Sequence, residues 1–417
     1  MNLDLTPEDE AFRAEARAWL RAHVPARRPP SLETAEGFAA HRAWEAELVA
    51  DRWSVVDWPA RFGGRDAGLV RRLLFEEEYW AAGAPGRVGQ NGVSLLAPAL
   101  FTHGTEEQRA RVLPPMATGA VVWAQAWSEP EAGSDRAALR SRAVRADGGW
   151  LLSGLKTWSS RAAFADRAFG LFRCAPDTPK PHQGLVYVMF GLREPGVTVR
   201  PIARLDGRPA FAELHLDRVF VPDADVIGTP GDGWRIAMAT AADERGPTLR
   251  SPGRYLAAAD RLHALWRAAG SPVWARDRVA DALTGARAHQ LFTYAAASRH
   301  LACEPVGPES SENKVFWSEY DLALHETALD LLPDHPPPTP NSSVPPTDPA
   351  HLTHSADMTD PADPADPLTD PHRQWQEWHA WQEGYVFALA GPLYAGTNEI
   401  QRDIVAERLL GLPRGRR

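Results

Sequence analysis

The sequence predicts an α+β protein in three consecutive parts. These are an N-terminal helical domain over residues 1–119, a middle β-domain over 120–230 and a C-terminal helical domain over 231–417. Two observations predict this order. Apolar residues recur with the period of a helix in the first and last parts and with the two-residue period of a strand in the middle part. The length of 417 residues is enough for two or three domains with sizeable cores.

The first part begins with a clear helix start. Thr6 can cap a helix, and Pro7 suits its first turn. Phe12, Ala16 and Trp19 then fall on one face of that helix. Further amphipathic helices are predicted at 34–51 and 68–83.

The middle part contains short runs typical of strands. The runs are VVWAQAW, LRSRAVR, WLLSGLKTW, RAFGLFRC, GLVYVMFGL, GVTVRPIARL and FAELHLDRVFV. Turn residues such as Asp147-Gly148 separate them. Because no helical pattern lies between the runs, we expect a β-sandwich or barrel of about 110 residues.

Composition excludes several classes of protein. A net charge of −9 argues against nucleic acid as the main partner. The acidic N-terminus is unlike a signal peptide, and no apolar run approaches the ~20 residues of a membrane span. Cys174 and Cys303 lie far apart in the chain without the spacing of a zinc site. We therefore expect a cytoplasmic protein with no metal, no disulfide framework and no membrane span.

One segment of the C-terminal part differs from the rest. Residues 333–371 hold about a third of the chain's 37 prolines and repeat Asp-Pro-Ala. Such a composition cannot bury enough apolar surface to offset chain entropy, so the segment is predicted to be a disordered insertion. Either an inert insertion or a functional tail fits this composition. Helical sequence resumes at 373.

Three short motifs carry candidate chemistry. WAQAWSEPEAGSD, residues 123–135, places a hydroxyl and a small-residue turn after a strand, and a turn capped by Ser or Asp is the alternative. In GLKTWSS, Trp158 could form the wall of a flat cofactor, although a core tryptophan is the alternative. In ATAADERGP, Glu244 and Arg245 are adjacent on a helix, and solvent-exposed charges are the alternative.

Taken in order, these motifs and the C-terminal YAGTNEIQRDIVAERLLGLPR resemble the acyl-CoA dehydrogenase family. The resemblance includes GDGW before DERG and covers nearly the whole chain except the insertion. SENKVFWSEYDLALHETALDLL, residues 311–332, is similar to the family's penultimate helix. The resemblance implies a middle β-barrel or sandwich, a C-terminal four-helix bundle, and FAD bound between the domains.

The resemblance also implies a reaction. A carboxylate removes the α-proton of an acyl-CoA thioester while a hydride leaves the β-carbon, which yields a trans-2-enoyl-CoA. Most family members carry that carboxylate where this chain has Ala395, whose methyl group cannot accept a proton. A minority place it on an earlier helix directly before an arginine, which matches Glu244 and Arg245. We therefore expect Glu244 to be the base and the Ala395 backbone N–H to donate to the thioester oxygen.

Motif positions further imply the binding residues. For FAD these are Gln125, Trp127, Ser128, Gly133, Ser134, Trp158, Ser160, Thr397 and Glu399. For the acyl-CoA they are Ser134, Arg245 and Gly396.

Two family segments are not recognisable. These are an Arg-x-x-Phe-Gly near 270–290 and a Gly-Gly-x-Gly after the penultimate helix, and both serve the adenine half of FAD at a subunit interface. Some relatives form mixed tetramers, so we expect either a homo-oligomer or a mixed tetramer with a related subunit.

Three functional hypotheses follow. The leading one is an acyl-CoA dehydrogenase that passes electrons to an electron-transfer flavoprotein. A flavin oxidase or monooxygenase on the same fold, or a catalytically silent partner subunit, are the alternatives. The sequence does not predict which acyl group is used.

Overall fold

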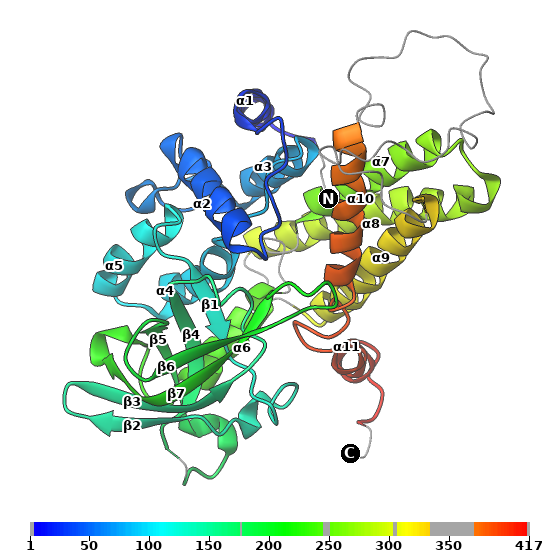
Figure 1. Ribbon diagram of the computed structural model, residues 1–417. Coiled ribbons are helices and arrows are strands. Elements are labelled where there is room, and N and C mark those ends of the chain that lie inside the picture. The colour runs from blue at the N-terminus through cyan, green and yellow to red at the C-terminus, as the bar shows by residue number, and fades with distance from the viewer. Residues whose placement is uncertain (1–3, 176, 245–250, 303–306, 334–370, 415–417) are drawn as a thin grey trace.

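The computed structural model describes residues 4–175, 177–244, 251–302, 307–333 and 371–414. Figure 1 shows helices at the N-terminal end, a strongly bent sheet below them and a group of long helices beside both. The α+β class predicted from the sequence is confirmed. No helix in the described part of the chain is long and apolar enough to cross a membrane.

The N-terminal part is helical. Its helices are α1 (Pro7–His23), α2 (Ala35–Ala50), α3 (Gly68–Ala81), α4 (Ala97–His103) and α5 (Glu106–Ala117), and a short π-helix, η2 (Gly92–Leu96), leads into α4. Thr6 caps α1 by accepting a hydrogen bond from the Asp9 backbone N–H, as predicted. On the inward face of α1, Phe12 and Ala16 are buried and Trp19 is partly buried. Each of the two other predicted helices is present.

All seven predicted strand runs form strands. They are β1 (Trp123–Ala126), β2 (Arg142–Ala146), β3 (Gly149–Lys156), β4 (Arg167–Arg173), β5 (Leu185–Gly191), β6 (Val197–Ile202) and β7 (Phe211–Pro222). The sheet order is β6-β7-β3-β2-β4-β5-β8, in which β8 is Val226–Ile227, and β1 pairs with β4 in parallel. β8 (Val226–Ile227) was not predicted, because two residues carry no periodicity.

The central strands β4 and β5 are buried on both faces. Phe169 and Tyr187 pack in one core with helical residues such as Ala241, whereas Phe172 and Val188 pack in a second core inside the bent sheet. This double burial explains why both strands are nearly continuous apolar runs.

The C-terminal part is helical again. Its helices are α6 (Gly233–Glu244), α7 (Pro252–Ala268), α8 (Arg276–Leu301), α9 (Glu309–Leu331), α10 (Pro371–Ala388) and α11 (Asn398–Ile404), and a π-helical turn, Val405–Leu409, follows α11. Helices α7 to α10 pack as a four-helix bundle around buried residues that include Trp317 and Trp381. Most of the predicted insertion lies outside the described residues.

A buried ion pair links α7 to α9 inside this bundle. Arg254 Nη2 lies 2.7 Å from Asp321 Oδ2, and His325 Nδ1 lies 3.3 Å from Asp321 Oδ1. Burial alone would raise the pKa of the Asp321 carboxyl, but Arg254 and His325 outweigh it and lower that pKa to about 2. The ionised carboxylate therefore stabilises the fold above its ordinary pKa of 3.8, and this contribution is lost as pH falls from 4 towards 2.

We predict that Asp321→Asn loses roughly 2 kcal/mol of unfolding free energy at pH 7. The variant should also lose less stability than wild type between pH 4 and pH 2, because it has no carboxylate to protonate. Urea unfolding at each pH measures both effects. Asp330→Asn is the matched control on the same helix, because Asp330 forms an exposed pair with Arg278 and should change little. Equal stability of Asp321→Asn and wild type at neutral pH would contradict this account.

Candidate active site

Two of the sequence motifs lie side by side. The turn after β1 carries Ser128, and the turn after β3 carries Trp158. The Thr157 backbone N–H donates to the Ser128 carbonyl at 2.9 Å, so the two turns are hydrogen-bonded to each other. The fold therefore brings together two segments that are separate in the sequence.

A buried ion pair lies next to these turns. Lys156 is fully buried, and its Nζ lies 2.8 Å from Glu129 Oε1 and 2.7 Å from the Leu171 carbonyl oxygen. Burial lowers the pKa of the Lys156 ammonium to about 8, although Glu129 opposes the shift. Burial would raise the pKa of the Glu129 carboxyl, but Lys156 and the Arg140 backbone N–H lower it. Both groups are therefore charged at neutral pH.

Trp158 is held in a turn with its ring exposed. Its φ is +58°, its side chain is 59% exposed, and its ring meets Phe211 edge to face at 5.8 Å. The alternative of a core tryptophan is therefore wrong. The backbone of the next residue, Ser159, is paired in both directions with Ala212, which fixes the turn, and Ser160 is half-buried. An exposed indole that is held in a fixed position is suited to pack against the flat ring of a ligand.

Buried donors without partners lie close to these turns in the chain. Within the described part of the chain, Gln125 Nε2, Trp127 Nε1 and Ser159 Oγ have no hydrogen-bond partner. Such groups are rare in folded proteins because each one loses its hydration without compensation. Trp127 itself is buried against Tyr187, with 6.2 Å between ring centroids. This set of donors fits the polar edge of an isoalloxazine ring.

The turn that follows, residues 130–135, is exposed at Gly133 and Ser134. A Cβ on Gly133 would have no atom within 4 Å, so protein packing does not require a glycine there. Asp135 precedes a 3-10 turn at Arg136–Ala138 but makes no side-chain capping bond to it. Capping by Asp135, part of the alternative explanation of this motif, is therefore not observed.

The C-terminal turn is anchored to α9. Asn398 Oδ1 accepts from Lys314 Nζ at 2.6 Å and from Ser318 Oγ at 3.1 Å. The left-handed Ala395, with φ of +57°, is buried, and its carbonyl accepts from Gln401 Nε2 at 3.1 Å.

Three further positions in this turn were singled out from the sequence. Gly396 also has a positive φ, of +83°, Thr397 caps α11, and Glu399 is exposed. Within the described residues, the Ala395 N–H has no acceptor.

Glu244 is the last residue of α6 and is only 8% exposed. The alternative of a solvent-exposed charge is wrong for this residue. The helix is fixed in place because Ile236, Ala237 and Ala241 pack into the core shared with β4 and β5. No described residue forms a hydrogen bond or ion pair with the Glu244 carboxylate. Arg245 lies outside the described residues.

A cavity of about 840 Å³ lies where the three parts of the chain meet. Ser251, the N-cap of α7, and Tyr255 of α7 line it, and both follow Glu244 closely in the chain. Arg161, which follows Trp158 closely, lines it as well. Neither Glu244 nor Ala395 is among its described lining residues. The volume is in the range of small-molecule sites.

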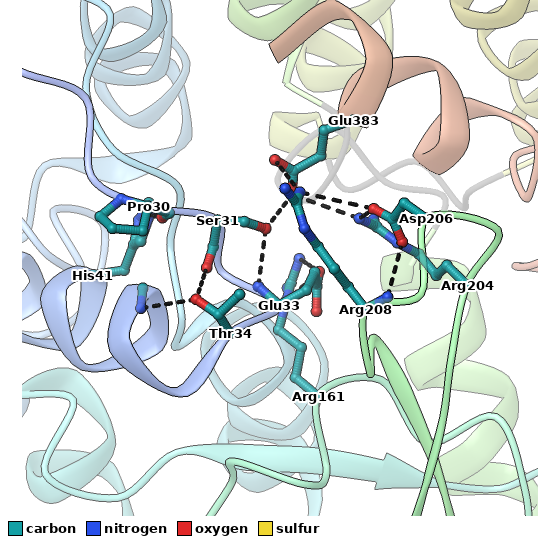
Figure 2. Close-up of polar contacts among 11 residues, drawn as sticks. Pro30, Ser31, Glu33, Thr34, His41, Arg161, Arg204, Asp206, Arg208 and Glu383 are labelled. Carbon is teal, nitrogen blue, oxygen red and sulfur yellow. Dashed lines mark hydrogen bonds and ion pairs between the residues drawn. The ribbon is translucent and has the colours of Figure 1, made fainter. Parts of the chain in front are cut away.

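Glu383 of α10 joins the three parts at this cavity, as Figure 2 shows. It accepts a short hydrogen bond from Ser31 of the N-terminal part and lies 3.1 Å from Arg208 Nη1 of the β-domain. A second link runs from Glu33 to Arg161, with 3.1 Å between the charged atoms. The walls of the cavity are therefore held together by ionic contacts between domains.

Two structural lysines were not predicted from the sequence. The lysines of the chain are Lys156, Lys180 and Lys314, and the first and last are fully buried at the two sites described above. Because nearly all basic residues of this chain are arginines, the rarity of lysine was the sequence signal that could have indicated a structural role for these positions. The residues that line the cavity could not be predicted from a local pattern, because they come from segments that are far apart in the sequence.

Comparison with known proteins gives consistent results. A family model described as the acyl-CoA dehydrogenase N-terminal domain matches residues 6–120, and one described as the middle domain matches 124–219. The chain is 34% identical to acyl-CoA dehydrogenase IpdE1 of Mycobacterium tuberculosis over 416 residues, with 97% of this chain and 98% of that protein covered.

Two solved structures share the fold. A structure described as the Tcur3481-Tcur3483 steroid ACAD has a TM-score of 0.79 at 24% identity, and the match covers 100% of both chains. The ChsE4-ChsE5 complex from Mycobacterium tuberculosis has a TM-score of 0.75, also at 24% identity and also with 100% of both chains covered.

We predict that Lys156→Met destabilises the protein by ~3–5 kcal/mol, because Glu129 is left buried without its counter-charge. The double variant Lys156→Met/Glu129→Leu should recover much of this loss. Lys180→Met, at an exposed lysine, is the matched control and should behave as wild type. Guanidinium unfolding measures all three. If Lys156→Met unfolds at the same denaturant concentration as wild type, the ion pair does not stabilise these turns.

Proposed function

The chain belongs to the acyl-CoA dehydrogenase family, and from that premise we propose that it oxidises an acyl-CoA thioester to the trans-2-enoyl-CoA in the cytoplasm. The observation that carries this proposal is which side chains occupy positions 244 and 395, a glutamate and an alanine. A buried carboxylate ends α6, while the family's usual position for the base holds a methyl group beside an N–H that has no acceptor among the described residues.

Each residue has a physical role in this proposal. Glu244 accepts the α-proton of the thioester. The Ala395 N–H donates to the thioester oxygen, where negative charge develops as that proton leaves. Ser134, Arg245 and Gly396 contact the acyl-CoA, with Arg245 facing its phosphates.

FAD is the proposed cofactor. It supplies the acceptor for the hydride that leaves the β-carbon. Gln125, Trp127 and Ser128 would meet the polar edge of its ring system, and Trp158 and Ser160 would lie along the ring's other side. The unpartnered donors near these turns support this assignment. Gly133, Ser134, Thr397 and Glu399 would contact the remainder of the molecule.

We also propose two protein partners. The first is an electron-transfer flavoprotein, which removes the electrons. The second is another subunit, identical or related, that completes the adenine half of the FAD site. The absence of Arg-x-x-Phe-Gly near 270–290 supports a related subunit, as does the fold shared with a complex of two named proteins.

We predict that the protein, alone or with its partner subunit, binds FAD non-covalently and shows flavin absorbance. Trp158→Ala should weaken FAD binding about 5-fold, because it removes an aromatic wall worth ~1 kcal/mol. Fluorescence titration of the apoprotein with FAD measures this. Trp274→Ala removes another exposed indole and is the matched control. A colourless protein that FAD cannot reconstitute under either condition would refute cofactor binding.

We predict that Glu244→Gln retains FAD and acyl-CoA binding but slows flavin reduction by at least ~10²-fold, because the amide cannot accept a proton. Anaerobic stopped-flow bleaching of the flavin by an acyl-CoA measures the rate. Glu312→Gln, at an exposed position on α9, is the matched control. Unchanged bleaching by Glu244→Gln would place the base elsewhere.

A rescue variant sharpens this test. Glu244→Gln/Ala395→Glu returns a carboxylate to the family's usual position and should recover part of the lost rate. Turnover in air without any added acceptor would instead support an oxidase or monooxygenase.

A further inference from the structure

The turn before α11 contains two successive residues with left-handed backbone. The φ angles are +57° at Ala395 and +83° at Gly396. A glycine adopts this conformation at little cost, but an alanine does not, because its Cβ crowds the following carbonyl oxygen. Left-handed residues that carry a side chain persist only where the surrounding structure holds them. The conformation of Ala395 therefore requires a contact that maintains it.

Gln401 of α11 provides this contact. The residue is buried, with 1% of its surface exposed, and its Nε2 donates to the Ala395 carbonyl at 3.1 Å and to the Gly396 carbonyl at 3.4 Å. Within the described part of the chain, no other group donates to either carbonyl. One side-chain amide therefore orients the two peptide units that follow Ala395.

The Gln401 amide lies very close to this turn. A Cβ on Gly396 would lie 2.3 Å from Gln401 Nε2, so a side chain at position 396 would displace the amide. The other polar atom of the amide, Oε1, is buried and has no partner among the described residues. The contacts with the turn are therefore the only hydrogen bonds that this amide makes to the described residues.

Asn398 holds the same turn in a different way. Its Oδ1 accepts from Lys314 and Ser318 of α9, which fixes where the turn lies on the helical bundle. The Asn398 side chain makes no hydrogen bond to the carbonyl of Ala395 or Gly396 among the contacts of the described residues. The orientation of these two carbonyls therefore depends on Gln401.

We propose that Gln401 is a positioning residue, which holds the Ala395 N–H in the direction from which it donates to the thioester oxygen. This inference rests on the proposed function, because that oxygen belongs to the proposed substrate. The Ala395 Cα joins the peptide unit that carries this N–H to the unit whose carbonyl Gln401 holds. Without Gln401, Ala395 relaxes towards right-handed backbone and the N–H changes direction. A misaligned donor no longer stabilises the charge that develops on the oxygen.

Gln401→Met tests the proposal, because methionine keeps the length of the side chain but cannot donate a hydrogen bond. The FAD-loaded protein is used, with its partner subunit where one is needed. At saturating acyl-CoA the variant should reduce flavin about 10-fold more slowly, a smaller loss than complete removal of an oxyanion donor causes. The dissociation constant of the acyl-CoA should change by about 2-fold or less, because the donor acts mainly in the transition state.

Infrared spectroscopy reports on the donor itself. Straight-chain, branched and ring-bearing trans-2-enoyl-CoA thioesters, labelled with carbon-13 at the carbonyl, are bound to the protein and compared by difference spectra. A hydrogen bond lowers the carbonyl stretching frequency, so wild type should lower it relative to the free ligand and Gln401→Met should lower it less. The same frequency in both proteins, or no shift in wild type with any of these ligands, would overturn the proposal.

Gln108→Met is the matched control. Gln108 of α5 is also a buried glutamine whose Nε2 donates to two carbonyls, that of Ala224 at 3.0 Å and that of Val226 at 2.6 Å. The control should lose stability but keep the wild-type rate of flavin reduction and the wild-type carbonyl frequency. Equal effects of the two substitutions on flavin reduction would leave Gln401 with a structural role alone and contradict the proposal.

Ala395→Gly in the Gln401→Met background provides a rescue test. Glycine adopts left-handed backbone without the cost that alanine carries, so part of the lost rate and part of the frequency shift should return. No recovery in a double variant that is folded by circular dichroism would contradict the claim that Gln401 holds a strained alanine.

The two readouts separate the positioning role from the proposed function. Flavin reduction that is equally fast in wild type and Gln401→Met would support dehydrogenation and refute the positioning role. A carbonyl shift that depends on Gln401, in a protein that no acyl-CoA reduces, would refute dehydrogenation and support the positioning role.

Discussion

The two turns that carry Ser128 and Trp158 depend on the buried ion pair between Lys156 and Glu129. The carboxylate also accepts from the backbone N–H groups of Arg140 and Ser141, and the ammonium also donates to a carbonyl of β4. This one ion pair thus connects the segment after β1, the segment before β2 and the end of β3. A charge in such a place is tolerated only when every partner is present, so the pair also specifies the positions of the turns. A compact ammonium suits this enclosed site better than a planar guanidinium, which explains a lysine in an arginine-rich chain.

The residues assigned to the candidate site come from more than one part of the chain. Glu244 ends a helix packed against the sheet, Ala395 lies in a turn anchored to α9, and Trp158 extends from the β-domain. Glu383 then holds the N-terminal and β parts against α10. These contacts of Glu383 exist only when all three parts are docked.

Much of the fold could be predicted from the sequence because the signals are local. Short apolar or alternating runs bounded by turn residues marked all seven longer strands, and Thr6 marked the start of α1. The two-residue β8 had no detectable period. In the candidate site, motif order indicated Glu244 and Trp158, but the Lys156–Glu129 pair was missed because pairing across 27 residues leaves no local pattern. The cavity was missed for the same reason, since Arg28, Arg208 and Glu383 belong to different parts of the chain.

The central claim is that Glu244 takes the α-proton while the Ala395 N–H stabilises the charge that forms on the thioester oxygen. Exchange of the α-proton with deuterium oxide measures that step directly in the protein reconstituted with FAD, and mass spectrometry of the recovered acyl-CoA reads it out without depending on an electron acceptor. The account predicts rapid deuterium incorporation by wild type and almost none by Glu244→Gln. Incorporation at the same rate in both proteins would contradict it.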